Sequence, residues 1–267
     1  MLPEEPTTVL LDDKVAVVYG AGAIGGAVAR AFAHEGAEVV VASRTLALAE
    51  AVVADIAAAG GRAEAASVEA SDEAAVEAHV AAVEARAGVI DILFNAIDVD
   101  DIQGTPLLEM ELADVVGPVV KAVTTQFITA RAVARRMAER GAGVILSVSI
   151  APAPVALHGS FGVACATIEG LWRSLAIELG PHGIRTVILR SAGSPDAPGV
   201  REVLVQHAEA QGLTLDEFLA RVSRGNALRR WPLLDEVANA AVLMASDRAS
   251  ATTGAMINVT TGGWFDL

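Results

Sequence analysis

Short apolar runs alternate along the chain with longer stretches in which apolar residues recur at helical spacing. The short runs are rich in β-branched residues and lie at 15–20, 38–43, 91–96, 144–149, 185–193 and 254–260. Apolar strands that alternate with helices are typical of βαβ units, in which helices cover both faces of a parallel sheet. No low-complexity linker or internal repeat interrupts the pattern. We therefore expect a single α/β domain over residues 1–267, with 1–13 as an N-terminal arm.

Four glycines follow the first apolar run, in the segment YGAGAIGGAV at 19–28. Gly20, Gly22 and Gly25 fit the pattern G-x-G-x-x-G, and Ile24 lies inside it. The first glycine permits a tight turn, the second lets a pyrophosphate approach the backbone, and the third lets the helix pack closely. Glycines in a turn can also serve packing alone. Because the motif joins the first strand to a helix, it predicts dinucleotide binding on a Rossmann-like, doubly wound parallel sheet.

The residues after the second strand bear on the choice of nucleotide. That strand ends in VVVASRT, so that Ser43 is followed by Arg44 and Thr45. An acidic side chain here would bond the ribose 2′-hydroxyl of NAD, whereas an arginine accommodates a 2′-phosphate. A solvated arginine at the start of a loop is the alternative. We expect NADP(H) rather than NAD(H), through Ser43 and Arg44.

Composition narrows the class of protein. The formal net charge of −14 argues against nucleic-acid binding, which requires a basic face. No apolar run reaches the roughly eighteen residues of a membrane span, and the acidic N-terminus does not resemble a signal peptide. The single cysteine, Cys165, excludes an internal disulfide and fits a reducing compartment. We expect a cytoplasmic protein that acts on a small molecule without membrane, nucleic acid or metal.

Several segments together resemble the short-chain dehydrogenase/reductase family over nearly the whole chain. They are the glycine motif with its βαβ unit, SDEAAV at 71–76, DILFNA at 91–96, EGLWRSLAIELGPHGIRTV at 169–187 and DEVANAAVLMASDRASATTGAMINVTTGG at 235–263. The resemblance implies an NAD(P)-dependent oxidoreductase. It also implies a dimer or tetramer formed through the segments 107–140 and 160–180, whose apolar residues exceed what one buried face requires.

The resemblance also implies cofactor contacts. Glu69 stands where an Asp usually meets the adenine amino group. Asn95 and Ala96 stand in a segment that reads NAID where the family has Asn-Asn-Ala-Gly. Gly193 remains from a Pro-Gly-x-x-x-Thr segment that holds the nicotinamide carboxamide, whereas Ala192 and Ala197 replace its proline and threonine.

The family's catalytic pair is replaced in this sequence. Alignment on TIEGLWRSLAIELG places Phe161 at the position of the catalytic Tyr and Cys165 at that of the Lys. Phenylalanine cannot exchange a proton, and a thiol carries no fixed positive charge. The chain has one tyrosine, Tyr19 in the nucleotide loop, and its lysines are Lys14 and Lys121. We therefore expect a non-standard active site.

Two residues are candidates for the missing proton donor. His158 precedes Phe161 by three residues, and imidazole suits proton transfer near neutral pH. A histidine that merely caps the next helix is the alternative. Ser149 ends an apolar strand beside Ile150, which occupies the family's serine position. The segment 196–231 takes the place of the family's substrate-binding lid.

These residues leave three hypotheses for function. The first is a reductase that uses NADPH on an imine or an activated C=C bond, neither of which needs a phenolic acid. The second is a non-redox enzyme that catalyses elimination, isomerisation or cyclisation. The third is a cofactor-binding protein without turnover. The retained glycine loop favours the first, although fold alone does not establish function.

Overall fold

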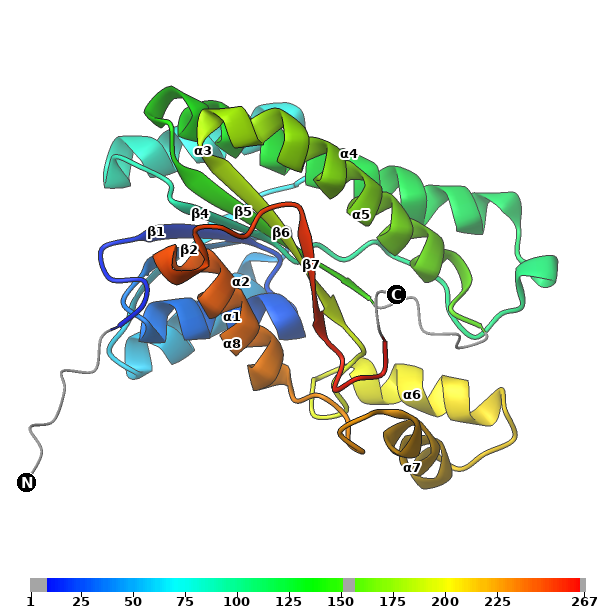
Figure 1. Cartoon of the computed structure of the whole chain (residues 1–267). Helices are drawn as coiled ribbons and strands as arrows, with labels where there is room; N and C mark the ends of the chain where they lie inside the picture. Colours follow the sequence, from blue (N-terminus) through cyan, green and yellow to red (C-terminus); the bar gives the residue numbers. More distant parts are fainter. Residues whose placement is uncertain (1–8, 151–156, 265–267) are drawn as a thin grey trace, which may run out of the picture.

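The computed structural model describes residues 9–150 and 157–264 (Figure 1). Within these ranges, parallel strands form one sheet in the order β3-β2-β1-β4-β5-β6-β7. The strands are β1 (Val15–Tyr19), β2 (Glu38–Ser43), β3 (Arg62–Ser67), β4 (Ile92–Asn95), β5 (Gly143–Ile150), β6 (Ile184–Ser191) and β7 (Ala255–Val259). The order reverses between β1 and β4, where doubly wound sheets bind their ligands. The predicted fold class is confirmed.

Helices cover both faces of the sheet. The helices are α1 (Ala23–His34), α2 (Leu46–Ala58), α3 (Glu73–Ala87), α4 (Leu112–Arg140), α5 (Gly159–Leu179), α6 (Val200–Glu209), α7 (Leu215–Gly225) and α8 (Leu234–Ala245). Figure 1 shows α3, α4 and α5 over one face and α1, α2 and α8 over the other. The segment predicted at 107–140 begins with a short 3₁₀ turn, Leu107–Glu109, so that α4 itself starts at Leu112.

The central strands are buried on both faces. Along β1, Ala16 and Val18 pack into the core under α1 and α8, whereas Val15 and Val17 pack into the core under α3, α4 and α5. Alternate side chains of a strand point to opposite faces, so a strand covered on both sides is apolar throughout. This explains the unbroken apolar runs in the sequence.

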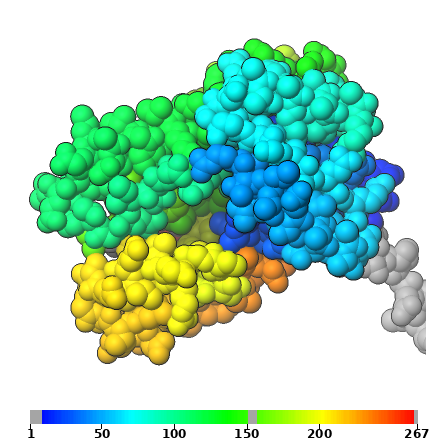
Figure 2. All heavy atoms as spheres, turned by 180° about the vertical axis from the view of Figure 1, so that it is seen from behind, coloured from blue at the N-terminus to red at the C-terminus, as the bar shows by residue number. Residues whose placement is uncertain are grey.

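Helices α6 and α7, which lie within the segment 196–231, form a separate lobe beyond the strand ends. The lobe has a small core of its own, made by Leu204, Ala208 and Phe218. Thr214 begins α7 with a capping box, in which its hydroxyl accepts from the Glu217 N–H and the Glu217 carboxylate accepts from the Thr214 N–H. Figure 2 shows a hollow between this yellow lobe and the green and blue parts of the molecule.

Part of the predicted N-terminal arm belongs to the folded body. Leu11 is fully buried, and its N–H donates to the Glu35 carbonyl at 2.9 Å. Residues 1–8 lie outside the described ranges. In the part of the chain that the structure describes, no helix is long and apolar enough to cross a membrane, and no three His, Cys, Asp or Glu side chains are grouped as a metal site.

Candidate active site

The glycine motif forms the turn between β1 and α1, and its geometry explains each glycine. Gly20 has φ +103°, and a Cβ there would lie 2.2 Å from the Ala96 carbonyl oxygen. A Cβ on Gly25 would lie 1.9 Å from the Gly20 oxygen. Gly22, at the N-terminus of α1, faces open space, and no side chain caps the helix. The turn therefore offers free N–H groups and room for an anion at a helix N-terminus, as a pyrophosphate requires.

A cavity of about 240 Å³, here called the nucleotide cavity, lies in front of this turn. Its walls come from the carboxyl ends of β1 to β4 and from α4. The predicted cofactor residues that line it are Gly20, Gly22, Ser43, Arg44, Glu69 and Ala96. One edge of a parallel sheet thus gathers residues that lie far apart in the sequence, as the fold requires.

The charged residues of the nucleotide cavity lie at its rim. Arg44 is exposed, and among the described residues no ion pair is found for it. Glu69 accepts hydrogen bonds from the Ser71 N–H and hydroxyl, and these bonds hold the pKa of the Glu69 carboxyl below its usual value. Lys121 of α4 also lines the cavity and forms an ion pair with Asp100. The rim therefore presents cations and a carboxylate to a nucleotide.

Two predicted cofactor residues lie behind the cavity wall. Gly25 packs against Gly20 and Ala96. Asn95 is fully buried, and its amide nitrogen donates to the Thr129 hydroxyl at 2.9 Å. Neither residue is among those that line the nucleotide cavity in the described part of the chain, so both support the turn from within.

A second cavity of about 290 Å³, here called the apolar cavity, lies between the ends of β5 and β6, the start of α5 and the lobe of α6 and α7. Apolar side chains make up most of its walls, among them Ile24, Ile150, Phe161, Val200, Val203, Leu204, Phe218, Trp231 and Leu234. Its described lining contains no Asp, Glu, Lys or Arg. Gly193, a predicted cofactor residue, lines this cavity together with Ser194.

Phe161 and Cys165 occupy different surroundings on α5. The Phe161 ring lines the apolar cavity. Cys165 is buried behind it, and burial raises the pKa of the thiol to about 12. Tyr19 offers no substitute: it is fully buried, its hydroxyl bonds the His79 Nδ1 atom at 2.8 Å, and burial raises its pKa. No tyrosine hydroxyl therefore faces the apolar cavity.

Ser149, a catalytic candidate from the sequence, is not among the residues that line the apolar cavity. Its hydroxyl donates to the Glu169 Oε1 atom at 2.9 Å. Glu169 in turn forms a buried two-bond ion pair with Arg190 at 2.7 and 2.8 Å. The neighbouring Ile150 lines the cavity instead, because successive residues of a strand face opposite sides.

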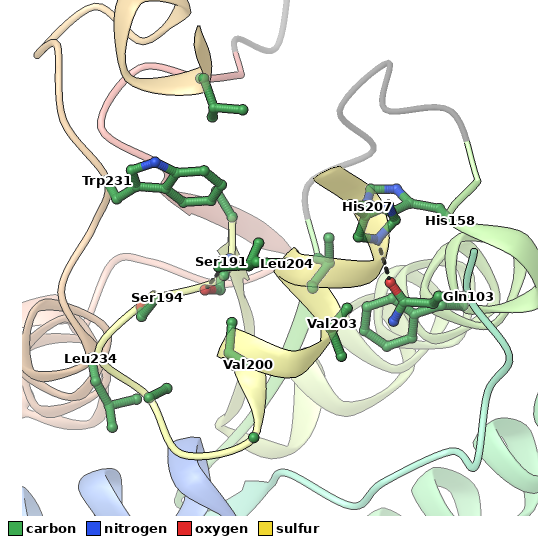
Figure 3. A pocket seen from close by; sticks show the side chains of 18 of the residues that line it. Gln103, His158, Ser191, Ser194, Val200, Val203, Leu204, His207, Trp231 and Leu234 are labelled. Carbon is green, nitrogen blue, oxygen red and sulfur yellow. Dashed lines mark hydrogen bonds between the residues drawn. The ribbon is translucent and has the colours of Figure 1, made fainter. Parts of the chain in front are cut away.

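His158 lies directly before α5 and in the wall of the apolar cavity, and its side chain makes no capping hydrogen bond to the helix in the described part of the chain. Burial and the nearby His207 lower the pKa of its imidazole. Its ring centre lies 5.5 Å from that of His207, and the rings are nearly perpendicular. Figure 3 shows the two imidazoles next to each other at one end of the cavity.

Sequence reasoning missed three polar residues of this cavity, namely His207, Gln103 and Ser194. The His207 Nε2 atom and the Gln103 Oε1 atom are 3.0 Å apart, although 104 residues separate them in sequence. The Ser194 hydroxyl is buried and has no hydrogen-bond partner among the described residues. Ser194 follows Gly193 directly, so its position could have been found from the altered Pro-Gly-x-x-x-Thr segment.

Comparison with known proteins places the chain among oxidoreductases. Residues 20–263 match the family described as enoyl-(acyl carrier protein) reductase. D-threitol dehydrogenase of Mycolicibacterium smegmatis is 32% identical over 257 residues, which are 95% of this chain and 94% of that protein. The short-chain reductase protein NovJ of Streptomyces niveus is 32% identical over 97% of this chain and 98% of its own length.

Solved structures with a similar fold are also dehydrogenases. Sorbitol-6-phosphate 2-dehydrogenase SrlD from Erwinia amylovora superposes with a TM-score of 0.87 at 28% identity, over 94% of this chain and all of that chain. A 7α-hydroxysteroid dehydrogenase in complex with NADH has a TM-score of 0.82 at 28% identity, over 97% and 98% of the two chains. The chain therefore belongs to the short-chain dehydrogenase/reductase family.

Proposed function

We propose that this protein is an NADP(H)-dependent reductase with a non-standard active site, acting on an imine or an activated C=C bond. The observation that carries the proposal is the composition of the apolar cavity. Its lining includes the family's Gly193, Phe161 in place of a phenol, and the imidazole of His158. A substrate there meets an imidazole and no tyrosine hydroxyl.

The nucleotide cavity supports the cofactor assignment. Gly20 and Gly25 are glycines for steric reasons, whereas Gly22 leaves open the space that a pyrophosphate would fill. Arg44 and Ser43 are the groups that would hold a 2′-phosphate, and Glu69 would meet the adenine. The buried Ser194 hydroxyl next to Gly193 has no partner among the residues that the structure describes, and it is suited to bind the nicotinamide carboxamide in place of the family's threonine.

The chain's own residues decide which substrates fit the site. NADPH, when bound, supplies a hydride to carbon. A ketone also needs a proton delivered to the forming alkoxide, and a positioned acid contributes typically 10²–10⁴-fold to such a step. An iminium ion carries that proton already, and a neutral imine or conjugated alkene can take it from His158 or water. We therefore expect little turnover of simple ketones.

The lining indicates an apolar substrate. Polyols, such as the one named in D-threitol dehydrogenase, carry several hydroxyl groups that each need a partner when buried. The apolar cavity offers few polar side chains and no charged one along its described wall. A compact apolar molecule with one reactive polar group fits these walls better.

NADPH fluorescence on mixing with the purified protein tests the assignment. A strong, blue-shifted enhancement, followed by oxidation of NADPH with a cyclic imine or a cyclic enone, is the expected result. Binding without turnover of either probe would favour the cofactor-binding alternative, and no enhancement at all would favour a non-redox enzyme. Brisk reduction of simple ketones, at about the 10 s⁻¹ typical of enzymes, would show that another residue replaces the tyrosine.

A further inference from the structure

His207 is the most buried polar side chain facing the apolar cavity from the α6 and α7 lobe. It is 3% exposed and lies in the last turn of α6. Its ring stacks on Phe218 of α7, with centres 6.4 Å apart and planes 11° apart. These contacts fix the plane of the imidazole, so that its two nitrogens point in defined directions.

Gln103 and Asp101 determine which nitrogen of His207 carries the proton. The Gln103 amide nitrogen donates to the Asp101 Oδ2 atom at 2.8 Å. A carboxylate can only accept, so the amide NH₂ must face Asp101 and the amide oxygen must face His207. The His207 Nε2 atom therefore donates to the Gln103 oxygen at 3.0 Å. In the neutral ring this leaves Nδ1 without a proton, as a hydrogen-bond acceptor.

The Nδ1 atom of His207 is buried and has no hydrogen-bond partner in the described part of the chain. Buried polar atoms are nearly always bonded, so an unpartnered one needs an explanation. The neighbouring polar ring is that of His158, 5.5 Å away between centres. At this separation a side-chain rotation of His158 can bring a ring N–H onto Nδ1. Catalytic hydrogen bonds are often long before the substrate is bound and shorten in the complex.

We propose that His207 is the positioning residue for His158: its Nδ1 accepts one N–H of His158 and turns the other nitrogen of that ring toward the substrate. The inference rests on the proposed reductase function. It adds to that function a chain of hydrogen bonds that positions the proton donor His158. The chain consists of the carboxylate of Asp101, the amide of Gln103 and the imidazole of His207. None of these three residues is expected to touch the reacting atoms.

The proton balance of the step is simple. In its protonated form, His158 has two N–H groups, of which one is held by His207 and the other faces the substrate. Hydride adds to the carbon of the C=N bond, the bond's electron pair moves to nitrogen, and nitrogen takes the proton from His158. His158 is left neutral and keeps the N–H that His207 accepts. Bound NADPH would supply the hydride, and the imine would be reduced to an amine.

The pH dependence of the reduction follows from the protonation of His158 and from the charged groups near it. Asp101 faces His207 through Gln103, and the Arg221 guanidinium of α7 lies 5.8 Å from the centre of the Phe218 ring. His158 itself lies directly before α5, and burial and the nearby His207 hold its pKa below the ordinary value for histidine. The proton-donating form therefore becomes more populated as the pH falls, and we expect reduction to be faster on the acid side of neutrality.

Titration of the His158 ring by ¹⁵N NMR tests the proposal without a substrate. The variants are His207→Ala, which removes the acceptor, His207→Gln, which keeps an acceptor oxygen, and Gln103→Leu, which frees the Nε2 proton. Gln206→Ala, at an exposed position of the same helix, is the control. NADPH affinity close to that of the wild type shows that each variant is folded.

We expect His207→Ala and Gln103→Leu to lower the proton affinity of His158 about tenfold, and His207→Gln and Gln206→Ala to leave it nearly unchanged. In the wild type, His207 should carry its proton on Nε2. In the arrangement described, where the two rings are not hydrogen-bonded, His207 lowers the pKa of His158. The proposed bond reverses this effect, because a neutral Nδ1 acceptor stabilises protonated His158. If the two imidazoles only repelled each other, His207→Ala would raise the proton affinity of His158 instead. That result, no change in His207→Ala, or an Nδ1-protonated His207 would overturn the proposal.

An activity measurement separates this proposal from the proposed function. With NADPH and 2-methyl-1-pyrroline as the probe imine, the kcat of the wild type should follow the titration of His158. His207→Ala should shift that profile to lower pH and reduce kcat more than it changes KM. If the wild type binds NADPH but reduces neither this imine nor 2-cyclohexenone, the reductase assignment fails, while the NMR titrations still decide the role of His207.

Discussion

The buried ion pair beneath the active site provides the sharpest test of how this fold is held together. Glu169 of α5 accepts from Arg190 of β6 and from the Ser149 hydroxyl of β5, at 2.7 to 2.9 Å. The side chains of Glu169 and Arg190 are only 9% and 8% exposed. Glu169→Ala would leave a guanidinium and a hydroxyl in the interior without this carboxylate.

The expected loss is large because the substitution removes a carboxylate that makes two hydrogen bonds to a buried charge. Removing one partner of a buried ion pair typically costs about 3–5 kcal/mol. For a chain of this size, each kcal/mol lowers Tm by roughly 2–4 °C. We therefore expect Glu169→Ala to lower Tm by roughly 6–20 °C, the product of these two ranges. Ser149→Ala should cost less, about 1.5–3 kcal/mol, because it removes one hydrogen bond to a charged group.

Urea unfolding at neutral pH, followed by circular dichroism, measures these losses. Asp55→Ala is the matched control, since Asp55 pairs with Arg30 on the surface, where the side chains are 62% and 41% exposed. An exposed pair contributes at most about 1 kcal/mol. If Glu169→Ala reduced the free energy of unfolding no more than Asp55→Ala does, the buried carboxylate would not stabilise the fold as its contacts imply. Ser149→Ala should leave NADPH affinity unchanged, and a large loss of affinity would show that Ser149 serves the site directly.

Three further predictions concern the cofactor and the assembly. Arg44→Ala should weaken NADPH binding about tenfold and leave NADH binding nearly unchanged. A charge-assisted bond to phosphate is worth roughly 1.5–3 kcal/mol, and we expect the lower end because this arginine is exposed. Equal losses of affinity for the two cofactors in fluorescence titrations would show that Arg44 does not recognise the 2′-phosphate. Ser194→Ala should weaken both cofactors by a similar factor, whereas Ser194→Thr should keep the hydroxyl and most of the affinity. We expect light scattering at micromolar concentration to give the mass of a dimer or tetramer, and a monomeric wild type would contradict the predicted assembly. An exposed apolar stripe on α4 is formed by Leu112, Val116, Val120, Val123 and Phe127. We expect Val120→Glu, within this stripe, to reduce the measured mass.

The fold could be predicted from the sequence because local signals agree along most of the chain, although β3, with the sequence RAEAAS, is not an apolar run. Each predicted strand is present, and the glycine motif lies at the turn that it specifies. The orientation of Ser149 and Ile150 could not be predicted in the same way. β5 carries serines at alternate positions, Ser147 and Ser149, but both of its faces are covered. The alternation therefore does not show which side meets the cavity, and a shift of one residue exchanges the two sides. Only the packed structure determines which of these two residues reaches the cavity.

The group of polar residues at one end of the apolar cavity could not be predicted from the sequence for a different reason. Gln103 lies in a loop after β4, His158 precedes α5, and His207 lies on α6. No local periodicity links such positions, because their proximity depends on where the α6 and α7 lobe docks. His158 was identified by its distance from Phe161 in the sequence, whereas His207 had no such landmark. Only tertiary packing brings Gln103, His158 and His207 together.

The separate core of the α6 and α7 lobe has a consequence for how such enzymes diversify. Leu204, Ala208 and Phe218 pack mainly with one another and with residues of their own segment, apart from the two cores that flank the sheet. Substitutions there change the walls of the apolar cavity without disturbing the strands that hold the nucleotide. Selection can therefore exchange the lobe as a unit, so that one inherited scaffold acquires new substrates while its cofactor chemistry stays the same.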